Sequence, residues 1–303
     1  MTSAKDWYEG ARPRTLPAAI APVLIGSSIA FWENAFNALS ALLALIVALA
    51  LQVGVNYAND YSDGIRGTDE VRVGPVRLVG QKLAAPTAVK KAATLSFGVA
   101  LLAGGVLTLM TQQLIFIPIG ILAVVSAWFY TGGPNPYGYL GLGEIFVFVW
   151  FGLVAVIGTA FAQTGQLTTL SIVLGVGSGG FACALLVINN LRDIPGDTKV
   201  GKRTLAVKLG DARTRILYVT LIWIGLGSSL AVCAAAIVYP QSGLPIWIGG
   251  SVLAAAVAHV PGRAVINGVV GRDLIAVLAG TGRAQMVWSI LVASALVAEA
   301  SFR

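Results

Sequence analysis

The chain alternates between long apolar stretches and shorter polar connections. Each apolar stretch approaches the roughly 20 residues that an α-helix needs to cross the hydrocarbon core of a bilayer. The stretches lie at residues 16–32, 36–60, 88–110, 113–131, 143–162, 167–190, 213–238, 244–262 and 284–300. This pattern predicts an all-α integral membrane protein with nine transmembrane helices, and we expect one intramembrane domain over residues 1–303.

The composition supports the same class of protein. Of the 303 residues, 57% are apolar and 11% are charged, whereas a soluble protein carries roughly 25% charged residues. The mean hydropathy is +0.83. The first residues of the chain are rich in charged side chains and have no apolar core, so we expect no cleavable signal peptide.

The basic residues are confined to alternate connections. Apart from Arg303, every Lys and Arg lies in the N-terminal segment, in the connections at 61–87, 132–142, 191–212 and 263–283, or at the helix ends beside them. The positive-inside rule therefore predicts a cytoplasmic N-terminus and an external C-terminus. The net charge of +7 reflects this topology, and nucleic acid is not an expected partner.

A cluster of carboxylates closes the second apolar stretch, in the sequence NYANDYSDGIRGTDE at residues 56–70. If the helix continues, Asn56, Asp60 and Asp63 fall at positions i, i+4 and i+7, on one face. Carboxylates so close together repel each other unless a cation lies between them. The segment alone fits either a metal site at the end of a membrane helix or a solvated acidic loop.

The same arrangement follows the sixth apolar stretch, in NNLRDIPGDTKVGKRTLAVKLG at residues 189–210. Asn189, Asp193 and Asp197 fall at i, i+4 and i+8, and we expect Pro195 to bend or end this helix. Basic residues follow both clusters on the same side of the membrane, namely Arg72, Arg77 and Lys82 after the first and Lys199, Lys202 and Arg203 after the second. The repetition favours a metal site over a solvated loop.

The two clusters together indicate a particular ligand. Two Mg²⁺ ions would neutralise the four carboxylates, since Mg²⁺ takes carboxylate oxygens and completes its shell with water and phosphate. Acids in a membrane helix cost ~2.5–3.5 kcal/mol each near the bilayer centre, so a cluster of them demands a function. The nearby bases would then bind a diphosphate. We expect a substrate with a diphosphate head at the cytoplasmic surface and a long apolar tail between the helices.

These motifs carry a resemblance to a known family. NDYSDGIRGTD resembles the first Asp-rich motif of the intramembrane UbiA-type prenyltransferases, and NLRDIPGDTKVGKRTLAVKLG resembles their second. The resemblance covers the whole chain and agrees with the nine helices of that family. Within it, ARPRTLPAAIAP, YTGGPNPYGYLGLGE and NNLRDIPGDTKVGKRTLAV resemble the 1,4-dihydroxy-2-naphthoate prenyltransferases of menaquinone biosynthesis.

The resemblance implies roles for the motif residues. Asp60 and Asp63 would hold one Mg²⁺, Asp193 and Asp197 would hold the other, and Asn56 and Asn189 would orient metal-bound waters or phosphate oxygens. The third acid of the first motif falls at Asp69 instead of four residues beyond Asp63, so this sequence departs from several relatives there. The implied reaction is Mg²⁺-dependent ionisation of a polyprenyl diphosphate, with attack by 1,4-dihydroxy-2-naphthoate and loss of CO₂ and diphosphate.

Further residues are candidates for contacts with the substrates. Tyr130 and Tyr137 would shield an allylic cation with their ring faces, and Glu144 would assist the acceptor hydroxyl. Either Arg14 or Lys202 would bind the acceptor carboxylate. We expect the enzyme in the cell membrane, with its active site facing the cytoplasm.

Two alternatives to naphthoate prenylation remain. The acceptor could instead be 4-hydroxybenzoate or homogentisate, because the generic motifs do not specify the ring. The chain could also be a secondary transporter of organic anions, but such sites usually lie at the bilayer midplane between broken helices. Here the acids are all placed at one side of the membrane.

Overall fold

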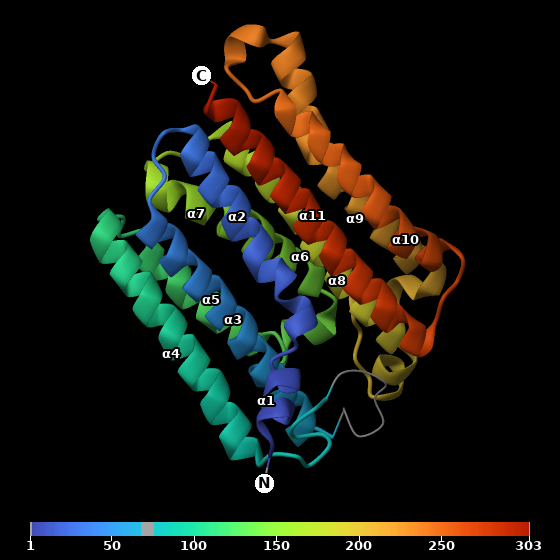
Figure 1. Cartoon of the computed structure of the whole chain (residues 1–303). Coiled ribbons are helices and arrows are strands. Elements are labelled where there is room, and N and C mark those ends of the chain that lie inside the picture. Colours follow the sequence, from blue (N-terminus) through green and yellow to red (C-terminus); the bar gives the residue numbers. More distant parts are fainter. Residues whose placement is uncertain (1, 68–75, 303) are drawn as a thin grey trace.

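A computed structural model describes residues 2–67 and 76–302, and every regular element in these two ranges is helical (Figure 1). The α-helices are α1 (Ala4–Gly10), α2 (Pro17–Trp32), α3 (Ala38–Ile65), α4 (Pro86–Thr111), α5 (Phe116–Phe129), α6 (Gly143–Val147), α7 (Ala155–Thr164), α8 (Thr169–Lys199), α9 (Leu205–Val238), α10 (Ala254–Ile266) and α11 (Leu274–Ala300). Shorter elements are η1 (Pro13–Thr15), η2 (Tyr137–Leu140), η4 (Pro240–Ser242), η5 (Trp247–Leu253) and η6 (Gly271–Asp273), and a π-helix, η3 (Phe148–Val154), joins α6 to α7.

The expectation of an all-α membrane protein is confirmed. Within the described ranges, seven helical segments are long and apolar enough to cross a bilayer, at Ala38–Ile65, Pro86–Thr111, Gly143–Thr164, Thr169–Lys199, Leu205–Val238, Trp247–Ile266 and Gly271–Ala300. The predicted first span corresponds to α2, which joins the preceding segment Ala4–Thr15 at a bend of 53°. The predicted fourth span corresponds to α5, an apolar helix of 14 residues.

Several helices extend further than the apolar pattern predicts. Helix α11 begins at Leu274 and not near residue 284, so Arg283 lies inside it. Helix α8 continues through Pro195 to Lys199, which carries the second acidic motif on a regular helix. Helix α9 begins at Leu205 and is kinked at Gly210, whose φ of 74° a glycine adopts without strain. Polar helix ends are therefore longer than hydrophobicity alone indicates.

The core of the bundle forms around α8. This helix packs against α9, α11, η3 and α2, and its contacts include the buried rings of Phe181 and Trp288, whose centroids lie 5.3 Å apart. At Gly152 the π-helix η3 approaches α8 so closely that a Cβ there would lie 2.5 Å from the Cα atom of Gly179. Backbone-to-backbone contact of this kind requires glycine, and it fixes η3 against α8.

A second group of helices lies beside this core. Helices α3, α4 and α5 pack against one another and stand together on one side of the bundle, whereas α9 and α10 stand on the other (Figure 1). Helices α2 and α11 run side by side between them. The first and last described residues lie at opposite ends of the bundle (Figure 1).

The contact at Gly152 gives the first prediction. A Gly152→Ala substitution should destabilise the purified protein by about 1–3 kcal/mol, because the new Cβ meets backbone atoms that no rotamer change can move. The measurement is the thermal unfolding midpoint in detergent. Gly98→Ala in α4, where a Cβ meets no atom within 4 Å, is the matched control, and an equal midpoint for both variants would contradict the packing described here.

Candidate active site

A cavity of about 770 Å³ lies between the two groups of helices. Helices α2, α3, α4, α5, α7 and α8 and the π-helix η3 all contribute to its wall. On α3 the lining runs from Ala44 to Asp63, which at 1.5 Å per residue is roughly 28 Å along the helix axis. Charged and amide side chains gather at the Asp63 end, and aliphatic and aromatic side chains line the remainder. The cavity thus has a polar head region and a long apolar region.

The polar face of α3 follows from helical periodicity. Gln52, Asn56, Asn59 and Asp63 line the cavity, and at about 100° per residue these four side chains fall within one narrow arc. Asp60 lies just outside that arc. The structure therefore places Asn56 and Asp63 in the cavity wall, together with Asn59, which the motif pattern does not indicate.

Asp63 is the carboxylate of the first motif that faces the cavity. Its side chain is buried, and its Oδ1 atom lies 3.0 Å from Nζ of Lys202. The hydroxyl of Tyr139 donates a hydrogen bond to the same oxygen, and Lys202 Nζ also lies 4.5 Å from the centre of the Tyr139 ring. These contacts join the first motif to the segment that follows the second motif.

Asp60 has a different environment from the one expected of a metal ligand. It is fully buried, lies outside the cavity lining formed by the described residues, and accepts hydrogen bonds from the backbone N–H groups of Leu78 (2.7 Å) and Val79 (3.2 Å). These residues directly follow Arg77, which is buried and lines the cavity. In this structure, then, the carboxylate of Asp60 anchors the backbone that carries Arg77.

The second motif places Asn189 and Asp197 in the cavity wall. The Nδ2 group of Asn189 donates to the carbonyl of Leu185 (3.2 Å), so its amide oxygen is directed elsewhere. Asp193 lies outside the lining and forms a two-point ion pair with Arg192, with both N···O distances at 2.8 Å. Arg192 itself lines the cavity, which makes Asp193 its support.

The predicted basic residues separate into two groups. Arg14, Arg77 and Lys202 line the cavity. Lys82, Lys199 and Arg203 are exposed and lie outside its described wall. Arg72 and Asp69 fall between residues 68 and 75, outside the described ranges.

Aromatic residues form the wall that faces α3. Tyr130 and Tyr137 both line the cavity, with ring centroids 5.5 Å apart in an edge-to-face arrangement, and Tyr137 stacks on Phe146 at 3.9 Å. Burial raises the pKa of the Tyr137 phenol, so its hydroxyl stays neutral and donates to the carbonyl of Ser126 (2.8 Å). Glu144 lies behind this wall, where its Oε1 atom accepts a 2.9 Å hydrogen bond from Asn190, a lining residue.

Several lining or adjoining residues were absent from the sequence-based set. They are Arg12, Asn59, Tyr139, Asn190 and Arg192. A signal existed for Asn59, because it precedes Asp63 by four residues, the same spacing as Asn56 and Asp60. No comparable local signal marked Tyr139 or Arg12, since their positions depend on how the loops fold over the helix ends.

The donor set at the polar end fits a hard divalent cation. Asp63 and Asp197 supply carboxylate oxygens and Asn189 supplies an amide oxygen. Among the described residues, no group of three or more His, Cys, Asp or Glu side chains could hold a metal ion by itself. Mg²⁺ commonly binds through one or two carboxylates and substrate phosphates, so this sparse carboxylate set suits Mg²⁺ better than a cation that needs an all-protein cage.

Comparison with known sequences identifies the family of the chain. Residues 19–267 match the model of the UbiA prenyltransferase family. The chain is also 49% identical to 1,4-dihydroxy-2-naphthoate octaprenyltransferase of Mycobacterium tuberculosis over 296 residues, which cover 98% of both chains. The chain belongs to the UbiA prenyltransferase family. It is 38% identical over 228 residues to the Escherichia coli protein of the same name, covering 73% of this chain and 74% of that one.

Solved structures of UbiA homologues share this fold. A homologue from Aeropyrum pernix matches with a TM-score of 0.68 at 13% identity, covering 93% of this chain and 97% of the other. A homologue from Archaeoglobus fulgidus, solved with DMAPP and Mg²⁺ bound, matches with a TM-score of 0.63 at 14% identity, covering 97% of this chain and 99% of the other. The bundle described above is therefore the UbiA fold.

The position of Asp60 gives the second prediction. Asp60→Ala should lower the unfolding midpoint of the protein even without Mg²⁺ and substrates, because it leaves two buried N–H groups unpaired at about 1–3 kcal/mol each. Asp273→Ala, at an exposed carboxylate directly before α11, serves as the control. A midpoint that changes only when Mg²⁺ is added would show that Asp60 acts as a metal ligand and not as a loop anchor.

Proposed function

We propose that this chain transfers a polyprenyl group from a polyprenyl diphosphate to 1,4-dihydroxy-2-naphthoate, as a step of menaquinone biosynthesis. The observation that carries the proposal is the cavity itself, in which one polar end with carboxylates and bases continues into a long apolar region. A diphosphate head and a polyprenyl tail match these two regions. The relatives named 1,4-dihydroxy-2-naphthoate octaprenyltransferase support the choice of acceptor.

The polar end would hold the diphosphate with Mg²⁺. Each motif contributes one carboxylate to the cavity, Asp63 from α3 and Asp197 from α8, and we assign one Mg²⁺ to each. The Archaeoglobus homologue that binds DMAPP and Mg²⁺ supports this use of the metal. When bound, Mg²⁺ stabilises the negative charge that develops on a departing diphosphate.

The chain's own bases would act on the same leaving group. Arg77, Arg192 and Lys202 line the polar end, and all three are buried there. Buried cations held in place before the reaction stabilise developing charge without reorganisation. Lys202, whose Nζ now contacts Asp63, and Arg192, which Asp193 orients, are therefore the residues we assign to the phosphate oxygens.

The aromatic wall would protect the allylic cation. Tyr130, Tyr137 and Phe146 present ring faces and edges to the cavity beside the polar end. Aromatic faces attract cations and supply no nucleophile of their own. The new C–C bond forms at the ring carbon that carries the acceptor carboxylate, the C–O bond to diphosphate breaks, and the carboxylate leaves as CO₂. Its bonding electrons restore the aromatic ring, which gives demethylmenaquinol, the reduced form of demethylmenaquinone.

The topology we propose has nine spans, with α2 and α5 as the two short ones. The two termini lie at opposite ends of the bundle, which agrees with an odd number of membrane crossings (Figure 1). The distribution of Lys and Arg supports a cytoplasmic N-terminus in the cell membrane. The active site then faces the cytoplasm, and residues 1–303 act as one prenyltransferase domain.

The activity is tested with protein purified in lipid nanodiscs. Given Mg²⁺, octaprenyl diphosphate and 1,4-dihydroxy-2-naphthoate, the protein should release diphosphate and CO₂ and form the prenylated quinol, and EDTA should stop the reaction. A parallel acceptor panel contains 4-hydroxybenzoate and homogentisate. Faster prenylation of either of these would overturn the acceptor we propose, and no prenylation of any ring would overturn the enzyme itself.

The role of the cavity carboxylates gives a separate prediction. Asp63→Asn should lower the rate of the chemical step by about a hundredfold or more, because Mg²⁺ loses a charged ligand and the departing diphosphate loses several kcal/mol of stabilisation in the transition state. Asp273→Asn, at an exposed carboxylate, should retain the wild-type rate. The measurement is single-turnover release of diphosphate, and wild-type kinetics for Asp63→Asn would contradict the assignment.

A further inference from the structure

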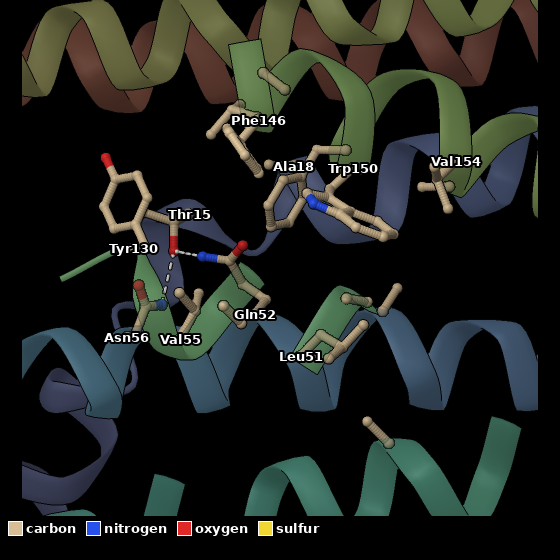
Figure 2. Close-up of a pocket in the computed structure, with 18 of the residues that line it drawn as sticks. Thr15, Ala18, Leu51, Gln52, Val55, Asn56, Tyr130, Phe146, Trp150 and Val154 are labelled. Atoms are coloured by element: carbon tan, nitrogen blue, oxygen red, sulfur yellow. Dashed lines mark hydrogen bonds between the residues drawn. The ribbon is translucent and has the colours of Figure 1, made fainter. Parts of the chain in front are cut away.

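Three polar side chains form a cluster in the cavity about two to three helical turns deeper than Asp63. Figure 2 shows Thr15 between Gln52 and Asn56, with both amides directed at its hydroxyl. Gln52 Nε2 donates to Thr15 Oγ1 at 2.8 Å, and Asn56 Nδ2 donates to the same atom at 3.1 Å. Gln52 and Asn56 are 6% and 4% exposed. Of these three residues, the sequence motifs indicate only Asn56.

The hydrogen bonds determine which way each amide faces. The Thr15 hydroxyl donates its proton to the carbonyl of Arg12 (2.9 Å), so its oxygen can only accept from the two amides. Asn56 Nδ2 also donates to the carbonyl of Ala11 (2.9 Å), an atom that only accepts. Both amides must therefore turn their NH₂ groups toward Thr15, and their carbonyl oxygens point away from it.

These two carbonyl oxygens have unused hydrogen-bonding capacity. No described residue donates a hydrogen bond to Oε1 of Gln52 or to Oδ1 of Asn56, and both side chains line the cavity. Neither oxygen belongs to the fully buried polar atoms that lack a partner, so both are open to the cavity. A ligand that brings hydrogen-bond donors can therefore reach them.

The opposite wall favours a flat ring. Phe146 and Trp150 line the cavity from α6 and η3, and Tyr130 also belongs to the lining (Figure 2). Aromatic side chains pack well against another aromatic ring, by offset stacking or edge-to-face contact. A ligand that carries donors on one edge of an aromatic ring therefore fits between these rings and the two amides.

Neither part of the prenyl diphosphate fits this description. A diphosphate offers only acceptor oxygens, which the carbonyls of Gln52 and Asn56 would repel, and a polyprenyl tail has no donors. Asn56 and Gln52 lie about 10 Å and 16 Å from Asp63 along the axis of α3. A ring placed at this depth would lie beside the first carbons of a tail whose diphosphate is bound at Asp63.

We propose that Gln52 and Asn56 bind the hydroxyl groups of the aromatic acceptor, through their carbonyl oxygens. The inference rests on the proposed function and adds the residues that recognise the acceptor. It moves Asn56 from the diphosphate, where the motif pattern placed it, to the acceptor. Thr15 is the positioning residue that holds both amides in register.

The test compares ligands with and without hydroxyls, in wild-type protein and in Gln52→Leu. The full chain in nanodiscs is titrated anaerobically, without prenyl diphosphate, with 1,4-dihydroxy-2-naphthoate and with 2-naphthoate. Wild type should bind the dihydroxy ring more tightly, and Gln52→Leu should reduce that ratio of Kd values about fivefold, the usual contribution of one neutral hydrogen bond. The Kd for octaprenyl diphosphate should stay unchanged.

Gln285→Leu is the matched control. Gln285 is also a buried glutamine in a membrane helix, but it lies outside the described wall of the cavity, so its replacement should leave the ratio at the wild-type value. Gln52→Met provides a second variant if Gln52→Leu does not fold. An unchanged ratio in a folded Gln52 variant overturns the proposal.

The same titration separates this proposal from the proposed function. 4-Hydroxybenzoate and benzoate form a second pair of ligands that differ by one hydroxyl. If the wild-type protein prenylates only the benzoate ring and Gln52→Leu removes the preference for its hydroxyl, naphthoate is the wrong acceptor and the amide site stands. If naphthoate is prenylated and the ratio of Kd values is the same in Gln52→Leu as in the wild type, the proposed acceptor is right and the proposed amide site is wrong.

Discussion

The cavity depends on keeping two carboxylates, Asp63 and Asp197, buried at the end of a membrane helix bundle. A buried carboxylate without a partner is strongly destabilising, and the structure surrounds Asp63 with the Lys202 ammonium at 3.0 Å and the Tyr139 hydroxyl. Arg77 and Arg192 add further positive charge to the same wall. A diphosphate needs the same excess of cationic donors, so the residues that make the acids tolerable also prepare the site for its anionic substrate.

Holding these charges in place requires a rigid frame on one side and open space on the other. Glycine contacts such as Gly152 with Gly179 bring η3 and α8 together at backbone distance, and α8 carries Asn189 and Asp197. Helix α3, which carries Asp63, packs mainly against α4, and it contacts α5 and, in the first group, α2. The cavity lies where these two groups meet without filling the space between them. Close packing within each group therefore leaves room for a long tail between the groups.

Much of this architecture could be predicted from the sequence, because hydrophobic periodicity and repeated Asn/Asp spacing are local signals. The sequence could not predict which of several neighbouring polar side chains points into the cavity. Asp60 lies at the edge of the polar arc of α3, and its direction is decided by the backbone of Leu78 and Val79, eighteen and nineteen residues away. Lys199 is exposed at the end of α8 and Lys202 is buried, and Gly201 between them has a φ of 74°. Such choices depend on loop geometry, which composition and spacing do not encode.

The polarity of the side chains on the cavity face of α3 decreases with depth in the membrane. From the helix end inward it presents Asp63, then the amides of Asn59, Asn56 and Gln52, then Ala48 and Ala44. The cost of desolvating a side chain rises from aliphatic to amide to carboxylate, and it rises with depth in the bilayer. The order that minimises this cost is also the order of a diphosphate, a hydroxylated ring and a hydrocarbon tail. One helix therefore aligns three chemically different groups, because the gradient that stabilises it in the membrane matches the polarity of its substrates.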